Sequence, residues 1–146
     1  MRAINHTVTG ALVGAAILNP WVALPAALFS HFVLDMIPHS GGGNHTSLFF
    51  KIELAIDAAF SAAFLLAIAI LQPDQWLLLV GCGILGAAPD LWWMPYWVWD
   101  LQGRHRELDA VGKIMSKIQW SETKAGYLLE AVWLVGTLYL FLQVTA

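Results

Sequence analysis

The chain has 146 residues, of which 59% are hydrophobic and 12% are charged, and its formal net charge is -3. Soluble domains carry roughly 25% charged residues, so this composition excludes an ordinary soluble protein and predicts an integral membrane protein. The length suits a single membrane-embedded domain over residues 1–146, and the small net charge gives no indication of a nucleic-acid partner.

Apolar runs separated by turn residues predict an all-α membrane bundle of about five helices. The predicted segments are residues 4–18, 21–37, 47–71, 75–99 and 125–144. The first two are short for spanning helices, which need about 20 residues, so a hairpin that only dips into the membrane is an alternative for them. The fourth contains Pro89 and Pro95, and either proline can interrupt a helix.

The polar stretch at residues 100–124 predicts a short amphipathic helix at the membrane interface. Apolar residues recur there at helical spacing, while Lys113 and Lys117 lie on other faces; the apolar set is Leu108, Val111, Met115 and Ile118. A solvated helix that packs on the bundle fits the same pattern equally well. An aromatic cluster precedes this stretch and is typical of an interfacial belt or a lipid-facing cleft. It comprises Trp92, Trp93, Tyr96, Trp97 and Trp99.

The basic residues indicate how the chain crosses the membrane. All of them lie at the N-terminus, close to the second connection or in the fourth, namely Arg2, Lys51, Arg104, Arg106, Lys113, Lys117 and Lys124. With five crossings these three places share one side, and the positive-inside tendency makes that side cytoplasmic. We therefore expect a multi-pass protein of the cell inner membrane, with the N-terminus in the cytoplasm and the C-terminus outside.

His31 and Asp35 lie four residues apart in the second predicted helix, so the imidazole and the carboxylate share one face. A carboxylate within an apolar run is costly unless something pairs with it. The topology brings further acids and histidines to the same cytoplasmic half, namely His6, His39, Glu53, Asp57, Asp90 and Glu130. Clustered carboxylates repel one another, and a divalent metal relieves that repulsion. Histidine and carboxylate ligands together favour zinc, with manganese or iron as alternatives.

Three segments of the chain resemble the membrane-bound predicted metal-dependent hydrolases of the YdjM type. They are Asn5-His6-Thr7 with Gly10 and Gly14, Ser30-His31-x-x-x-Asp35-x-x-Pro38-His39, and Gly86-Ala87-Ala88-Pro89-Asp90-Leu91. The metal-site residues that this resemblance implies are His6, His31, Asp35 and Asp90, with His39 as a further one. The family's proline–aspartate motif often continues with a second acid two residues on, where Trp92 stands in this chain.

The expected function is hydrolysis of a phosphate ester or an amide on a lipid-linked or membrane-associated molecule, with membrane lipids as partners. A metal-bound water would attack, and Asp57 or Glu53 would accept its proton as the general base. Two alternatives belong to other classes: a metal- or proton-handling protein such as a transporter subunit, and a structural or assembly subunit. An ion pathway would also need polar residues in the outer halves of the helices, and those halves are nearly all apolar.

Overall fold

Helices make up the fold in the computed structural model, which describes residues 1–41, 46–104, 106–123 and 125–145. Within these residues there is no strand, so the all-α prediction is confirmed for them. The elements are α1 (Ala3–Ile17), α2 (Pro20–Asp35), α3 (Leu48–Leu71), α4 (Trp76–Ala87), the 3-10 helix η1 (Ala88–Trp93), α5 (Met94–Leu101), α6 (Ala110–Ile118) and α7 (Gly126–Thr145).

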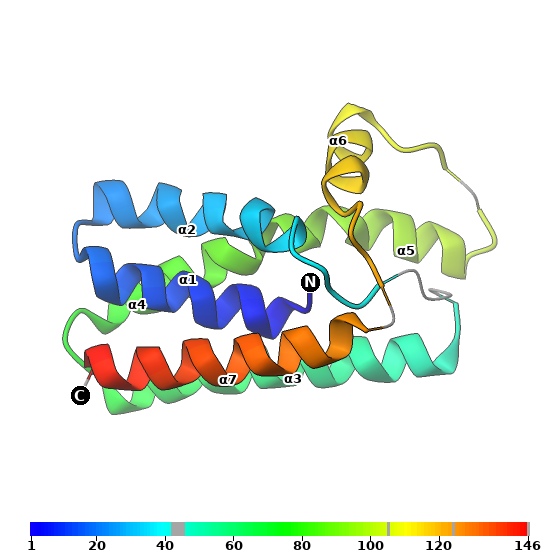
Figure 1. Ribbon diagram of the computed structural model, residues 1–146. Coiled ribbons are helices and arrows are strands. Elements are labelled where there is room, and N and C mark those ends of the chain that lie inside the picture. Colours follow the sequence, from blue (N-terminus) through cyan, green and yellow to red (C-terminus); the bar gives the residue numbers. More distant parts are fainter. Residues whose placement is uncertain (42–45, 105, 124, 146) are drawn as a thin grey trace.

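Helix α1 lies at the centre of the bundle. It packs against α2, α3, α4 and α7, and α2 also packs against α4. Figure 1 shows these helices running roughly side by side, with α5 continuing beyond α4 and α6 standing at one end. Because neighbours surround α1, most of its residues are buried, whereas α3 buries only Asp57 and Ile68.

Glycines let α1 and α4 approach each other closely. A Cβ atom at Gly10 would overlap the carbonyl oxygen of Cys82, and a Cβ atom at Gly86 would lie 2.5 Å from the carbonyl oxygen of His6. Only glycine fits such an approach of two helix backbones without displacement. The contact therefore holds the first turns of α1, with His6, directly against the last turn of α4.

Polar side chains fix where α2 and α3 begin. Asn19 Oδ1 accepts a hydrogen bond from the Trp21 N–H at 3.1 Å, and Ser47 Oγ accepts one from the Phe50 N–H at 3.1 Å. Such N-cap bonds satisfy backbone donors that have no partner inside the helix. They place these two helix starts close to the predicted boundaries at residues 21 and 47.

The predicted fourth segment is interrupted at Pro89. Helix α4 ends at Ala87, and the chain tightens into η1 before α5 begins at Met94. Proline lacks an N–H donor and its ring crowds the preceding turn, so the regular α-helix does not continue through it. The tighter turn leaves Asp90 Oδ1 3.8 Å from Nε2 of His31 on α2.

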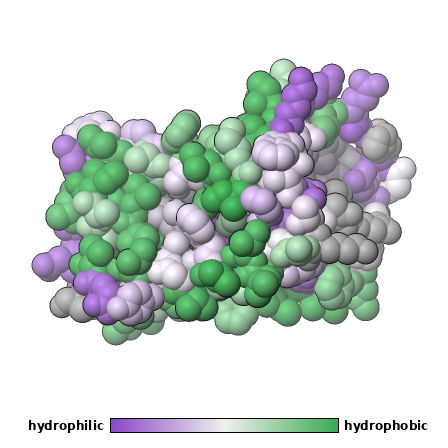
Figure 2. Space-filling model, viewed as in Figure 1, coloured by the Kyte–Doolittle hydropathy of each residue, from purple (hydrophilic) through white to green (hydrophobic). Residues whose placement is uncertain are grey.

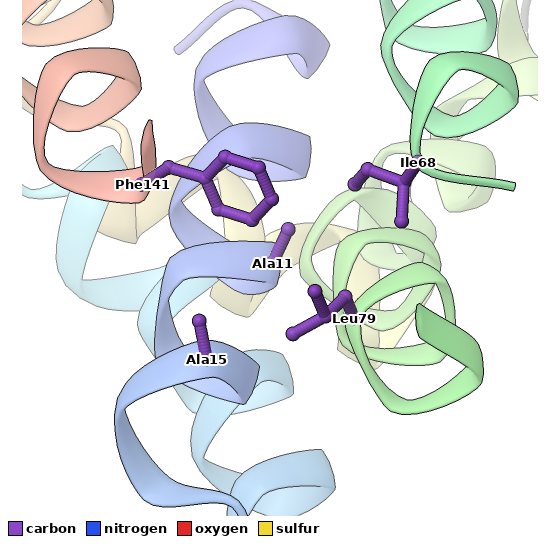
Figure 3. Packing of buried hydrophobic residues seen from close by; sticks show 5 residues of the cluster. All are labelled: Ala11, Ala15, Ile68, Leu79 and Phe141. Carbon is purple, nitrogen blue, oxygen red and sulfur yellow. The ribbon is translucent and has the colours of Figure 1, made fainter. Parts of the chain in front are cut away.

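An apolar cluster fills the bundle near the turns that follow α1 and α3. It comprises Ala11, Ala15, Ile68, Leu79 and Phe141, all buried. Figure 3 shows these side chains pointing toward one another from α1, α3, α4 and α7. This half of the bundle is therefore packed with hydrocarbon, in contrast to the polar interior around the start of α1.

Three helices are long and apolar enough to cross a membrane, namely Leu48–Leu71, Trp76–Leu101 and Gly126–Thr145. The apolar helices α1 and α2 have 15 and 16 residues, fewer than the roughly 20 that span a hydrocarbon core. Figure 2 shows large hydrophobic areas on either side of a paler middle, with hydrophilic residues around α6 and also at the opposite end. The described helices are consistent with a membrane protein.

Helix α6 is amphipathic and packs beside α2. Asp109 caps it, because its Oδ1 accepts a hydrogen bond from the Gly112 N–H at 2.8 Å. Met115 faces the protein and is buried, whereas Val111 and Ile114 are 44% and 59% exposed. The helix thus leaves an apolar stripe uncovered beside the bundle.

Candidate metal centre

Four of the residues expected to bind a metal lie together in the structure. His6 of α1, His31 and Asp35 of α2, and Asp90 of η1 each offer one ligand atom, and these atoms all lie within 4.8 Å of one another. Two ligands of one ion are at most about 4.2 Å apart, twice a bond of roughly 2.1 Å. Side-chain shifts of less than about an ångström therefore bring the group to coordination distance.

The Asp35 carboxylate bridges the Nε2 atoms of the two imidazoles. Its Oδ1 is 3.1 Å from His6 Nε2, and its Oδ2 is 3.2 Å from His31 Nε2. The two rings stack with their centroids 4.0 Å apart and their planes at 25°. All three side chains are almost entirely buried, whereas the Asp90 side chain is 22% exposed. Of the four residues, Asp90 is thus the one through which the cluster is most accessible to solvent.

A backbone contact orients His31. Its Nδ1 lies 2.9 Å from the carbonyl oxygen of Gly86, and a carbonyl only accepts, so Nδ1 carries the proton. In the neutral ring Nε2 then presents a lone pair toward Asp35 and Asp90. Histidines that bind metals usually hold their second nitrogen in this way, on a backbone carbonyl or a carboxylate.

Several nitrogens of the group lack hydrogen bonds. Among the described residues, His31 Nε2 and both ring nitrogens of His6 are buried and have no hydrogen-bond partner. Leaving such groups unsatisfied costs about 1–3 kcal/mol each. A lone pair and a carboxylate oxygen repel each other unless a proton or a metal cation lies between them, and a single metal ion would satisfy these atoms together.

Two further groups reach Asp35. The Met1 amino group donates to Oδ1 at 2.6 Å, and the Gln119 side-chain amide donates to Oδ2 at 3.2 Å. Gln119 follows α6 and was not among the residues expected from the sequence. No local pattern signals it, because the contact joins residues 84 positions apart. It brings the polar segment after α6 onto the cluster of histidines and aspartates.

Asp57 lies beside the cluster rather than in it. Its two carboxylate oxygens accept hydrogen bonds from the Ala3 and Ile4 N–H groups at 2.7 and 2.9 Å. These are unpaired donors at the start of α1, where a negative charge is also favoured by the helix dipole. Asp57 therefore anchors the helix turn that carries His6. Its role as the general base stays a prediction.

Glu53 belongs to a separate ion-pair network. Its Oε1 accepts from Arg2 Nη2 at 2.7 Å and from the Tyr127 hydroxyl at 3.1 Å. Arg2 Nε also lies 3.3 Å from Glu130, whose Oε1 accepts hydrogen bonds from the backbone N–H and the hydroxyl of Ser40. The network ties α1, α3 and α7 together, and it does not bring Glu53 or Glu130 into the cluster.

His39 is buried but lies outside the cluster. Its Nδ1 is 2.8 Å from the carbonyl oxygen of Ile37, and its Nε2 is 3.9 Å from Glu122. Its own carbonyl accepts from the Thr123 N–H at 2.8 Å. Pro38 ends the helix before this residue, so the ring follows a turn that leads away from the helix face shared by His31 and Asp35. The structure does not bring His39 together with the other four residues, and its role as a metal ligand stays a prediction.

Comparisons with known proteins add no relative. No protein-family model matches the chain, and neither a curated protein nor a solved structure shows significant similarity to it.

Proposed function

We propose that the protein is an integral membrane protein with a divalent-metal site, of zinc type, formed by His6, His31, Asp35 and Asp90. The observation that carries the proposal is His31 Nε2. This atom is buried, has no hydrogen-bond partner among the described residues and faces the carboxylates of Asp35 and Asp90. Two imidazoles and two carboxylates are a ligand set that suits zinc, with manganese or iron as alternatives.

A metal accounts for the two stacked histidines better than protons do. Protonating both rings would place two positive charges on imidazoles whose centroids are 4.0 Å apart, inside a buried site. Like charges at that separation repel strongly where water is absent. One ion shared by His6, His31 and Asp35 would add its positive charge beside that of the Met1 amino group, with both rings neutral and without that repulsion.

For this site we propose a hydrolase activity. Its substrate would be a phosphate ester or an amide on a lipid-linked or membrane-associated molecule. Three points support it: the ligand chemistry, the partly exposed Asp90, and the resemblance of the ligand-bearing segments to the YdjM-type hydrolases. A bound zinc ion would lower the pKa of a water molecule enough to make it a nucleophile near neutral pH. Asp57 and Glu53 stay the candidate bases, although both carboxylates are engaged in other contacts.

The location that we propose is the cell inner membrane, with the metal centre in the cytoplasmic half. Arg2 contacts Glu53 and Tyr127, so the N-terminus, the early part of α3 and the start of α7 lie at one end. Helix α6, with Lys113 and Lys117, stands at the same end (Figure 1). The positive-inside tendency makes this basic end cytoplasmic.

Transport is a less suitable function for this interior. Beyond the metal centre the bundle is closed by the apolar cluster of α1, α3, α4 and α7 (Figure 3). An ion that crossed the membrane along α1 would meet no polar partner in that cluster. The arrangement favours a site that opens on one side over a pathway.

Metal analysis tests the proposal directly. We expect purified wild-type protein to carry close to one zinc-type ion per chain under metal-replete conditions. His31→Ala and Asp35→Ala should lose it, measured by inductively coupled plasma mass spectrometry. His39→Ala is the matched control, because it removes a buried histidine outside the cluster and should retain the ion. A wild-type protein without stoichiometric metal would overturn the proposal.

Activity is tested with the same variants. We expect hydrolysis of a chromogenic phosphodiester in mixed micelles to require the metal, to disappear in His31→Ala and to persist in His39→Ala. If the protein binds metal but hydrolyses neither ester nor amide probes, the metal-site proposal stands and the hydrolase proposal is rejected.

A further inference from the structure

A shallow groove of about 300 Å³ lies beside η1, the short helix that also carries Asp90. The residues on either side of Asp90, Pro89 and Leu91, line this groove, whereas Asp90 belongs to the metal cluster. A 3-10 helix turns by about a third of a circle per residue, so neighbouring residues point in different directions. One short helix thus contributes residues to two distinct sites.

The walls of the groove are aromatic, with one cation and one carboxylate, Arg106 and Asp109. Trp92, Tyr96 and Trp99 form the walls together with Pro95, and Arg106 lies over the Trp99 ring, 4.4 Å from its centroid. A guanidinium over an aromatic face is held in place while its N–H groups remain directed to the side. The groove therefore combines an apolar floor with a donor that suits phosphate oxygens.

Asp109 also lines the groove, and its carboxylate is engaged in hydrogen bonds that hold this arrangement together. Its Oδ1 accepts from the Gly112 N–H at 2.8 Å and from Trp92 Nε1 at 3.3 Å, and its own N–H donates to the Tyr96 hydroxyl at 3.2 Å. The bond from Gly112 lowers the pKa of the Asp109 carboxyl. Because this carboxylate already caps α6, its charge is partly balanced by the helix N-terminus. The same bonds fasten the segment that carries Arg106 to η1 and α5.

We propose that this groove binds an anionic phospholipid, with the phosphate at Arg106 and the beginning of one acyl chain along the aromatic walls. This inference goes beyond the metal site and shares with the proposed function only the membrane location. A volume of about 300 Å³ is at the lower end for small-molecule pockets, so it suits a head group and a short chain segment rather than a whole lipid.

The position of the groove favours a lipid over a soluble ligand. Its aromatic walls belong to the last part of Trp76–Leu101, one of the three helices long and apolar enough to cross a membrane. Beside it, α6 exposes Val111 and Ile114 together with Lys113 and Lys117. Apolar and basic side chains side by side are typical of a helix at an anionic membrane surface.

Lipid binding by the delipidated full-length protein, followed by native mass spectrometry, tests the proposal. We expect phosphatidylglycerol to bind about ten-fold more tightly than phosphatidylcholine of the same chains. Arg106→Gln should remove most of this preference. Arg104→Gln is the matched control, because it makes the same charge change in the same connection but Arg104 does not line the groove. We expect Arg104→Gln to change the preference for phosphatidylglycerol by less than two-fold.

Three results would overturn the groove as a lipid site. The first is equal affinity of the wild-type protein for the two lipids. The second is an equal loss of the phosphatidylglycerol preference in Arg106→Gln and Arg104→Gln. The third is displacement of the lipid by millimolar inorganic phosphate. The metal content of the same samples separates this proposal from the first one. Loss of lipid preference with metal retained rejects only the groove, and metal-free wild-type protein that keeps its preference rejects only the metal centre.

Discussion

Asp35 is the residue on which the contacts of the proposed metal centre meet. It faces His6 and His31, and it accepts hydrogen bonds from the Met1 amino group and from the Gln119 amide. A carboxylate that must bind a metal in a fixed direction needs such supporting donors, because they restrict rotation of the ligand before the ion arrives. Gln119 is the only one of these contacts that comes from the segment after α6.

Replacing Gln119 tests whether this amide positions Asp35. We expect Gln119→Leu to weaken zinc binding by roughly ten-fold or more while leaving the saturated stoichiometry unchanged, since the four ligands remain. Competition with a chelator of known affinity measures this. Gln102→Leu, at an exposed position after α5, should leave the affinity as it is in the wild type. Unchanged affinity in Gln119→Leu would mean that the amide contact does not support the ligand.

Asp57 offers a second prediction for a single residue. Asparagine at this position would present only one oxygen to the two N–H groups that Asp57 accepts, so we expect Asp57→Asn to lower the stability by about 1–2 kcal/mol. The unfolding midpoint in detergent measures the loss, and the exposed Asp74→Asn should shift it by less than about 0.5 kcal/mol. If Asp57→Asn instead keeps full stability and metal but loses hydrolysis, Asp57 is the general base.

Among the elements, the pair α1 and α4 determines where His6 lies. The backbones are in contact at Gly10 and Gly86, and the Gly86 carbonyl also orients His31. One glycine therefore serves both histidines: its missing side chain admits α1, and its carbonyl fixes the tautomer of the ring on α2. Packing and ligand geometry are coupled at this crossing.

Gly86→Ala tests that coupling. The added methyl group would lie 2.5 Å from the His6 carbonyl oxygen, so we expect a loss of about 1–3 kcal/mol in stability and a reduced metal content as α1 moves away. Gly136→Ala is the matched control on α7, where nothing lies within 4 Å of the added atom. Gly136→Ala should leave the free energy of unfolding unchanged or raise it by up to about 1 kcal/mol. Equal thermal midpoints for the two variants would contradict a close α1–α4 contact.

For the whole molecule, hydropathy and turn residues were sufficient to predict an all-helical chain, and helical spacing paired His31 with Asp35. Alternating crossings placed His6 and Asp90 at a similar depth, because depth follows from the position of a residue along its helix. The direction in which a side chain points around the helix axis does not follow from its position along the helix. Asp57 lies beside the start of α1, but its carboxylate accepts hydrogen bonds from backbone N–H groups there and does not join the cluster.

Long-range contacts account for what the sequence did not reveal. The position of His39 depends on hydrogen bonding to Thr123, and Gln119 reaches Asp35 only because α6 packs beside α2. Neither contact leaves a periodic pattern in the chain. The central place of α1 is also a property of the assembled bundle, since its short length alone suggests a peripheral hairpin.

The orientation of the molecule in the membrane is the last prediction. The turn at Asp74 and the connection at Arg104 lie on either side of Trp76–Leu101, so a single crossing should separate them. With Asp74→Cys we expect labelling of intact cells by a membrane-impermeant maleimide, and with Arg104→Cys only labelling after permeabilisation. The wild-type protein serves as the blank, because Cys82 is 0% exposed. The reverse pattern would invert the orientation and place the metal centre outside, and labelling of both positions from one side would exclude a crossing by this segment.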